Sequence, residues 1–252
     1  MLENPENCRR VFVFLALMAV SLLGLLLLPQ IKQDQAYHDF ADQRTILGIP
    51  YFWNVVSNLP FIAVGAAGLR RARDPAIFAL FLGILMTGFG SFSYHLDPND
   101  STLFWDRLPM AISFMAILAL AIGERLDAKA GRVLLWPLIA IGIFSLLLWR
   151  WNGDLRLYGW VQFFPCVALL LFFLLFPPKY TGTSHWIFAA AMYALAKLFE
   201  FYDDTIYSAG SIVSGHTLKH LAAAGACFLV FMYFRGRQRI RTQPGLSIAS
   251  DR

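Results

Sequence analysis

Charged side chains are scarce in this chain. Asp, Glu, Lys and Arg make up 15% of its 252 residues, whereas a soluble domain of ordinary composition carries about 25%. Hydrophobic residues make up 58%, and the mean hydropathy is +0.57. So few charges cannot cover a water-exposed globule of this size, and so many apolar side chains cannot all be buried inside one. The composition excludes a disordered chain, a collagen and a coiled coil, and it predicts an integral membrane protein.

Cysteine is equally scarce. The three cysteines are Cys8, Cys166 and Cys227, and two of them lie inside apolar runs. This small number excludes a disulfide framework, and the sequence contains no CxxC pair or cysteine-rich zinc motif. The net charge of +5 is best interpreted as a signal for membrane orientation, because the cytoplasmic loops of membrane proteins are enriched in Lys and Arg. We therefore expect the membrane as a partner, and no nucleic acid.

Eight apolar runs follow one another along the chain. A bilayer core of about 30 Å needs about 17–25 helical residues, and each run approaches or reaches that length. The runs cover residues 11–28, 51–69, 76–94, 103–123, 133–149, 157–176, 185–202 and 215–234. The loops between them are too short for a soluble domain. The predicted fold is an all-α polytopic membrane helix bundle.

The first run admits two interpretations. Arg9 and Arg10 in front of an apolar stretch resemble the beginning of a secretory signal peptide. The length of the stretch and the lack of a small-x-small cleavage site after it favour a retained helix. The predicted organisation is listed in chain order: a cytoplasmic N-terminus (1–10), an extra helix (11–29), an outer loop (30–50), a seven-helix domain (51–235) and a basic, unstructured cytoplasmic tail (236–252).

The distribution of charge predicts the orientation of these helices. Lys and Arg gather at both termini and in alternate loops, while most aspartates lie in the other loops. Both termini are therefore predicted to be cytoplasmic, with the aspartate-rich loops on the extracytoplasmic side. With a rise of 1.5 Å per residue, helices carry His95, Asp106 and His216 about 27–28 Å from the inner ends of their runs. Three separate helices thus deliver polar side chains to one level near the outer interface.

The histidines at this level suggest a metal site. His216 and His220 are four residues apart, so both project from one face of a helix. His95 is the natural third ligand, and Ser91 lies one turn below it on the same face. We expect His185 to lie too far away and His38 to lie in a mobile outer loop. Each residue also has an ordinary explanation: packing histidines, a packing serine, and an N-cap or first-turn charge for Asp106. Their common depth favours a site.

These motifs resemble those of a known family. The stretch from Ser91 to His95, then Asp106, and then the His216-x-x-x-His220 pair are similar to the alkaline ceramidases, which belong to the CREST group of membrane hydrolases. The sequence FWNVVSN at residues 52–58 also resembles the FWN-x-x-SN signature of that family. The resemblance extends over residues 39–235, which is most of the chain. The run at 11–28 would then be a helix added in front of a seven-helix core.

The resemblance implies a zinc-dependent amidohydrolase. Zn²⁺ would be held by His95, His216 and His220, with Ser91 and Asp106 acting in catalysis beside it. Such an enzyme cleaves the amide bond of ceramide, or of a related N-acyl lipid, to a fatty acid and an amine. The residue types suit this reaction, because three imidazoles leave Zn²⁺ an open position for water, whose pKa falls to about 7. Asp106 can then move the proton, and the Ser91 hydroxyl can donate to the developing oxyanion.

A second metal site is less well supported. The family places a glutamate directly before the Phe-Trp-Asn stretch, within a carboxylate cluster that binds Ca²⁺, but this chain has Tyr51 there. Only Asp39 and Asp42 lie nearby, which puts a calcium site in doubt and favours an exposed loop in which these carboxylates pair with Arg44. Glu200 is a further polar candidate near the site, and the sequence predicts that it pairs with Lys197.

Other functions remain open at this stage. The same zinc centre would cleave an ester as readily as an amide, so a lipid esterase or phospholipase is an alternative. A receptor-like seven-helix protein that retains the zinc site is another, although the short cytoplasmic loops offer little surface for a partner. A transporter is disfavoured, because the polar residues concentrate at one interface and do not line a path through the membrane.

Overall fold

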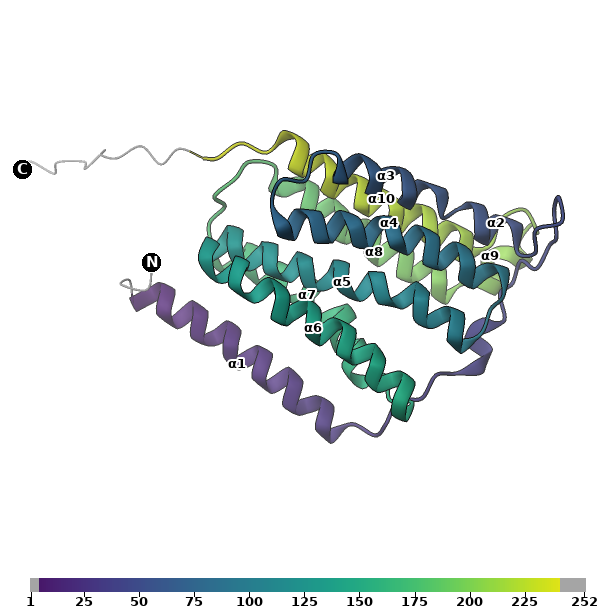
Figure 1. The fold of residues 1–252 in the computed structure, drawn as a ribbon, viewed down its shortest axis with the longest axis horizontal. Coiled ribbons are helices and arrows are strands. Elements are labelled where there is room, and N and C mark those ends of the chain that lie inside the picture. Colours follow the sequence, from purple (N-terminus) through teal and green to yellow (C-terminus); the bar gives the residue numbers. More distant parts are fainter. Residues whose placement is uncertain (1–4, 241–252) are drawn as a thin grey trace, which may run out of the picture.

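The computed structural model describes residues 5–240 and shows an all-helical bundle (Figure 1). The elements are α1 (Pro5–Leu27), η1 (Gln35–His38), α2 (Phe52–Val56), α3 (Leu59–Leu69), α4 (Pro75–Leu96), α5 (Asp100–Arg125), α6 (Ala128–Asn152), α7 (Arg156–Leu175), α8 (Thr183–Phe201), α9 (Asp203–Ser208) and α10 (Gly215–Gly236). The predicted fold class is confirmed. The predicted tail at 236–252 falls almost entirely outside the described residues.

Seven helical segments of the described chain are long and apolar enough to cross a membrane, so this is a multi-pass membrane protein. They are α1, the α2–α3 pair, α4, α5, α6, α7 and α10. The remaining predicted run, 185–202, forms α8, which packs along α10 but is not among the seven. Lys197 and Glu200 lower the mean hydropathy of this helix.

The run at 51–69 is not one continuous helix. It divides into α2 and α3 at Ser57 and Asn58. Pro60 enters α3 at its first turn and has no backbone N–H with which to continue the ladder from α2. The Ser57 hydroxyl and the Asn58 amide instead donate to the Asn54 carbonyl, at 3.0 and 2.8 Å. The break therefore leaves polar side chains and a carbonyl inside the bundle at this point.

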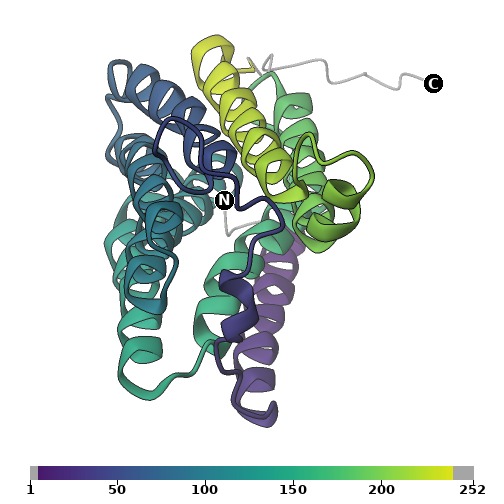
Figure 2. The same cartoon turned by 90° about the vertical axis from the view of Figure 1, so that its right-hand side faces the viewer.

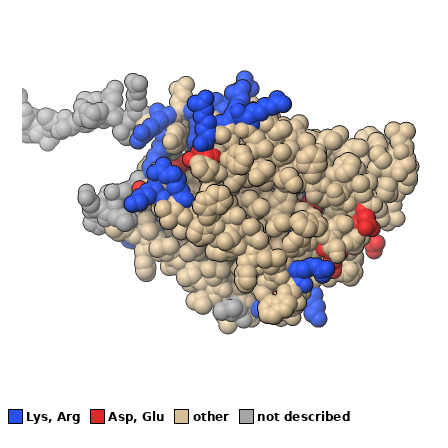
Figure 3. All heavy atoms as spheres, in the orientation of Figure 1, with Lys and Arg blue, Asp and Glu red and all other residues tan. Residues whose placement is uncertain are grey.

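The bundle has two ends of different character. At one end, the site end, α4 finishes and α5 and α10 begin. Figure 3 shows most of the visible Lys and Arg at the opposite end, near the end of the described chain. Figure 2 looks onto the site end and shows the segment between α1 and α2 crossing it. This outer segment, residues 28–51, lies over the beginning of α10.

The first helix packs against α7 and begins earlier than predicted. It starts at Pro5, so Arg9 and Arg10 lie within the helix and do not precede it. Phe14 packs its ring against Phe172 at a centroid distance of 4.6 Å. At the carboxyl end of α1, Arg156 donates to the carbonyl oxygens of Leu25 and Leu28, at 3.0 and 2.6 Å. These contacts attach α1 to the bundle near its middle and at its carboxyl end.

Candidate metal centre

Three histidines from two helices meet at the site end. His95 lies in the last turn of α4, and His216 and His220 lie in the first two turns of α10. All three are buried, with 1%, 4% and 4% of their surfaces exposed. One ligand atom from each lies within 4.8 Å of the others, and Nε2 of His95 is 3.2 Å from Nε2 of His220. The structure thus brings together the three ligands that the sequence predicts.

The spacing of these nitrogens suits a shared metal ion. Two nitrogens bound tetrahedrally at about 2.0–2.1 Å from one Zn²⁺ lie about 3.3–3.4 Å apart, close to the His95–His220 distance of 3.2 Å. The Nε2 atom of His216 is buried without a hydrogen-bond partner. Because a buried polar atom without a partner is costly, a cation bound among the rings would satisfy it. The donor set therefore fits a metal such as zinc.

The first turn of α10 is held in place by side chains outside the cluster. Ser214 caps the helix, accepting a hydrogen bond from the amide of Thr217 at 3.1 Å. The carboxylate of Asp203 accepts from the amide of His216 at 2.6 Å and from the amide of Ala41 at 3.1 Å. A carboxylate at a helix N-terminus is favourable because it satisfies free N–H groups and the helix dipole. Asp203 thereby joins α10 to the outer segment.

Ser91 and Asp106 lie beside the histidines on adjacent helices. Ser91 is buried on α4, one turn before His95, and its hydroxyl interacts with the carboxylate of Asp106 on α5. The N-cap of α5 is Asn99, so the interpretation of Asp106 as a capping residue is wrong. Asp106 lies in the second turn, with its carboxylate turned towards α4. The structure therefore places the two predicted catalytic side chains against one another.

The close approach of α4 and α5 at this point depends on Gly90. A Cβ atom at Gly90 would lie 2.4 Å from the carbonyl oxygen of Trp105 and 3.1 Å from Cα of Asp106. Such distances are shorter than van der Waals contact, so only glycine allows this helix crossing. The contact holds the backbones next to Ser91 and Asp106 at a fixed separation.

The ceramidase family model matches residues 47–234. The chain belongs to the ceramidase family. Comparison with curated proteins finds no match. The matched segment contains the three histidines, Ser91 and Asp106, and it begins after α1, which agrees with an additional N-terminal helix. Membership of the ceramidase family supports a hydrolase that acts on ceramide-type lipids at a membrane.

Two residues that the sequence did not single out contact the histidines of this ceramidase-family protein. Ser57, at the break between α2 and α3, places its hydroxyl oxygen 2.8 Å from Nδ1 of His220. Phe40, in the outer segment, packs its ring against His95 and His216 at centroid distances of 4.6 and 4.4 Å. Ser57 belongs to the FWN-x-x-SN signature, which was the one available signal, whereas nothing in the sequence distinguishes Phe40 from other aromatic residues.

Glu200 forms a network of charges next to the site. Its carboxylate accepts from Lys197 at 2.6 Å, which confirms the predicted pairing, and from Lys219 of α10 at 2.8 Å. The hydroxyl of Tyr37, in the outer segment, donates to it at 3.1 Å. The carboxylate of Glu200 therefore accepts hydrogen bonds from two ammonium groups and a phenol. This arrangement favours a structural role for Glu200, linking α8, α10 and the outer segment.

The outer segment is more ordered than the sequence suggests. His38 was expected in a mobile loop, but its ring nitrogens lie 2.8 Å from the Tyr94 hydroxyl and 3.0 Å from an Asp100 carboxylate oxygen. Asp39 is exposed. Asp42 is 2% exposed, so the expectation of an exposed loop is wrong at this residue.

The carboxylate of Asp42 is committed to Arg44. Its two oxygens accept from Nε and Nη2 of Arg44, at 2.8 and 2.6 Å. Burial alone would raise the pKa of Asp42, but the hydrogen bonds from Arg44 outweigh it and hold that pKa below its ordinary value. Within the described residues, the histidine cluster is the one group of three or more ligand side chains that could hold a metal. Asp42 is therefore the ion-pair partner of Arg44, as the sequence favoured.

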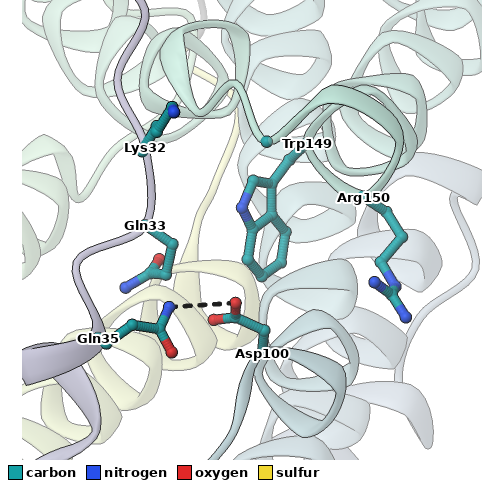
Figure 4. Close-up of a pocket in the computed structure, with 7 residues that line it drawn as sticks. Lys32, Gln33, Gln35, Asp100, Trp149 and Arg150 are labelled. Carbon is teal, nitrogen blue, oxygen red and sulfur yellow. Dashed lines mark hydrogen bonds between the residues drawn. The ribbon is translucent and has the colours of Figure 1, made fainter.

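A separate pocket opens at the site end, beside the outer segment (Figure 4). Its volume is about 270 Å³, and its lining residues are Lys32, Gln33, Gln35, Asp100, Trp149, Arg150 and Gly153. The amide of Gln35 donates to Asp100 across it at 3.2 Å. Its walls contain neither the histidines nor the two catalytic candidates, so it is distinct from the metal centre.

Proposed function

We propose that this protein is a zinc-dependent amidohydrolase that cleaves the amide bond of ceramide or a related N-acyl lipid. The observation that carries the proposal is the buried cluster of His95, His216 and His220 beside Asp106, in a chain of the ceramidase family. A zinc ion held by the three histidines would lower the pKa of a bound water to about 7 and polarise the scissile carbonyl.

Asp106 is the proposed proton carrier. It lies on α5, beside Ser91, and is not one of the three clustered ligands. Its carboxylate would therefore remain available as a base. It would accept a proton from the attacking water and return it to the leaving amine, a role that contributes about 10²–10⁴-fold in rate. The Ser91 hydroxyl has a single proton. In the resting site it orients Asp106, and it can turn to the carbonyl oxygen as charge develops there.

We also propose that α8 crosses the membrane as an eighth span, so that both termini are cytoplasmic and the site faces the extracytoplasmic side. The support is the concentration of Lys and Arg at the end of the bundle opposite the histidines (Figure 3), together with the enrichment of these residues in cytoplasmic loops. A centre at the outer interface suits a lipid whose polar linkage lies at headgroup depth while its acyl chains remain in the bilayer.

The decisive experiment measures zinc and hydrolysis together. Purified protein should contain about one zinc and release fatty acid from a short-chain ceramide. His216→Ala and His220→Ala should each lose most of the zinc and the activity, because each removes one of three ligands. His185→Ala is the matched control, since His185 lies at the start of α8 at the opposite end of the bundle. Full zinc retention in both site variants would exclude the metal assignment.

The same assay separates the amide from the ester alternative. A ceramide and a phospholipid with the same acyl chain are offered to the protein in the same vesicles. The proposal predicts release from the amide. Zinc-dependent release from the phospholipid alone would favour the lipid esterase, and zinc binding without release from either would favour the receptor-like protein.

A further inference from the structure

Ser57 contacts His220 on the side of the ring that faces away from the other two histidines. Its hydroxyl oxygen is 2.8 Å from Nδ1 of His220, while Nε2 of the same ring faces His95 at 3.2 Å. Both Ser57 and His220 are buried, with 5% and 4% of their surfaces exposed. The two ring nitrogens of His220 therefore have different surroundings: Nε2 points into the cluster and Nδ1 points at a hydroxyl.

The hydrogen bonds around Ser57 determine which nitrogen of the His220 ring carries the proton. Ser57 also lies 3.0 Å from the carbonyl oxygen of Asn54, which can only accept. A serine hydroxyl has one proton and two lone pairs, so when it donates to the carbonyl its oxygen accepts from the ring. Nδ1 of His220 then carries the proton, and Nε2 keeps the lone pair that a metal requires.

The break between α2 and α3 is what makes this carbonyl available. In a continuous helix the Asn54 carbonyl would accept from the amide of Asn58, four residues on. Here the backbone amide of Asn58 bonds to the Val55 carbonyl at 3.3 Å, and the Asn54 carbonyl accepts from the side chains of Ser57 and Asn58. The His220 ring also interacts with the Asn54 backbone. The interruption thus supplies an acceptor that holds the Ser57 hydroxyl in one direction.

The same segment also fixes the helix that carries His220. The side-chain oxygen of Asn54 accepts from the Thr217 hydroxyl at 2.8 Å and from the Ser214 hydroxyl at 3.3 Å. All three residues are buried. Asn54 therefore holds the first turn of α10 while Ser57 holds the ring one turn further on. Two polar residues of the FWN-x-x-SN signature have separate contacts with the metal-binding helix.

We propose that Ser57 is a positioning residue that fixes the metal-binding tautomer and orientation of His220. The proposal rests on the proposed function, because it presumes that the histidines bind zinc. Ser57 itself does not contact the metal position. Some residues bond to the second nitrogen of a ligand histidine in this way. Removing such a residue typically lowers metal affinity by about 10–100-fold.

The test is the affinity of the metal-free protein for Zn²⁺, measured by competition with a chelator. We expect Ser57→Ala to weaken zinc binding by about 10–100-fold. Ser145→Ala is the matched control, because Ser145 is also buried and also donates to a carbonyl three residues back, Gly142 at 2.7 Å, but on α6 away from the site. Its zinc affinity should equal that of the parent.

A second pair of variants covers the case in which the alanine variant does not fold. Thr and Val have nearly the same shape, but only Thr has a hydroxyl. We expect Ser57→Thr to bind zinc at least tenfold more tightly than Ser57→Val. Equal affinity of the two, or of Ser57→Ala and the parent, would overturn the role of Ser57. A parent protein that binds no zinc would instead overturn the proposed function, so the two failures are distinguishable.

Discussion

At the scale of single residues, Asp106 separates chemistry from metal binding. Asp106→Asn keeps the size of the side chain and its contact with Ser91, but an amide cannot accept the proton. We expect the rate of ceramide hydrolysis to fall by about 10²–10⁴-fold, while the zinc content remains that of the parent. Elemental analysis and fatty-acid release on the same preparation measure both quantities. Loss of zinc together with activity would make Asp106 a ligand or a fold residue, and full activity would place the proton carrier elsewhere.

How far the sequence predicts such residues depends on how local their signal is. His216 and His220 were predicted because their spacing places them on one helical face, and His95 because the helical rise carries it to the same depth. The contact between Ser57 and His220 joins residues 163 positions apart. Helical periodicity predicts only contacts between residues a few positions apart. The FWN-x-x-SN segment could therefore be recognised in the sequence, but its contact with His220 could not be predicted.

At the scale of helices, the crossing of α4 and α5 keeps the two catalytic candidates together. Gly90→Ala would insert a methyl group 2.4 Å from the Trp105 carbonyl oxygen, and overpacking of this kind costs about 1–3 kcal/mol. We expect a lower thermal midpoint and reduced hydrolysis, with zinc retained, because α5 must move away from Ser91. Gly159→Ala is the control, since a Cβ there meets nothing within 4 Å. Equal loss in both variants would show that the helix crossing is not the cause.

The attachment of α1 should depend on pH through Asp154. Hydrogen bonds from Arg156 hold the pKa of Asp154 below its ordinary value. Arg156 also donates to carbonyl oxygens in the last turn of α1 and directly after it. A carboxylate whose pKa is lowered by folding stabilises the folded state above its unfolded pKa of about 3.9 and loses this contribution as the pH falls through the lowered value. We therefore expect α1 to loosen only in strongly acidic solution.

Hydrogen exchange of the amides at 24–27, in the last turn of α1, measures this loosening. After correction for intrinsic exchange rates, protection of these amides should be constant from pH 7 to pH 5 and fall below about pH 4. Asp154→Asn should show the low protection already at pH 7, with α4 and α10 unchanged. Undiminished protection in Asp154→Asn would mean that Arg156 holds α1 without its carboxylate partner.

Helix boundaries were predicted less well than helix positions, for identifiable reasons. The sequence places α1 after its arginines, yet the helix begins at Pro5, because a hydropathy window ends at charge whereas a helix does not. The break at Ser57 and Asn58 was missed because the mean hydropathy of the whole run stays high despite these polar residues. Its causes are the missing N–H of Pro60 and the bonds of two side chains to the chain just before them.

At the scale of the whole molecule, the predicted orientation can be tested by labelling. In a background with the native cysteines replaced by serine, Asp97→Cys introduces a thiol at an exposed position just after α4, at the site end. A membrane-impermeant maleimide should label it in intact cells. Arg71→Cys, exposed at the opposite end, should be labelled only after permeabilisation. The reverse pattern would place the histidines on the cytoplasmic side.

The position of Phe40 has a consequence for how this protein would meet its substrate. The ring is 3% exposed and lies directly against two of the histidines. It belongs to the outer segment, which Asp203 and Glu200 hold in place. If the proposed function is correct, this cover would block a direct approach from water, and an acyl lipid would reach the cluster by diffusing within its own leaflet. The rate would then follow the mole fraction of substrate among the surrounding lipids, and diluting the bilayer with inert phospholipid would slow turnover even at constant bulk concentration.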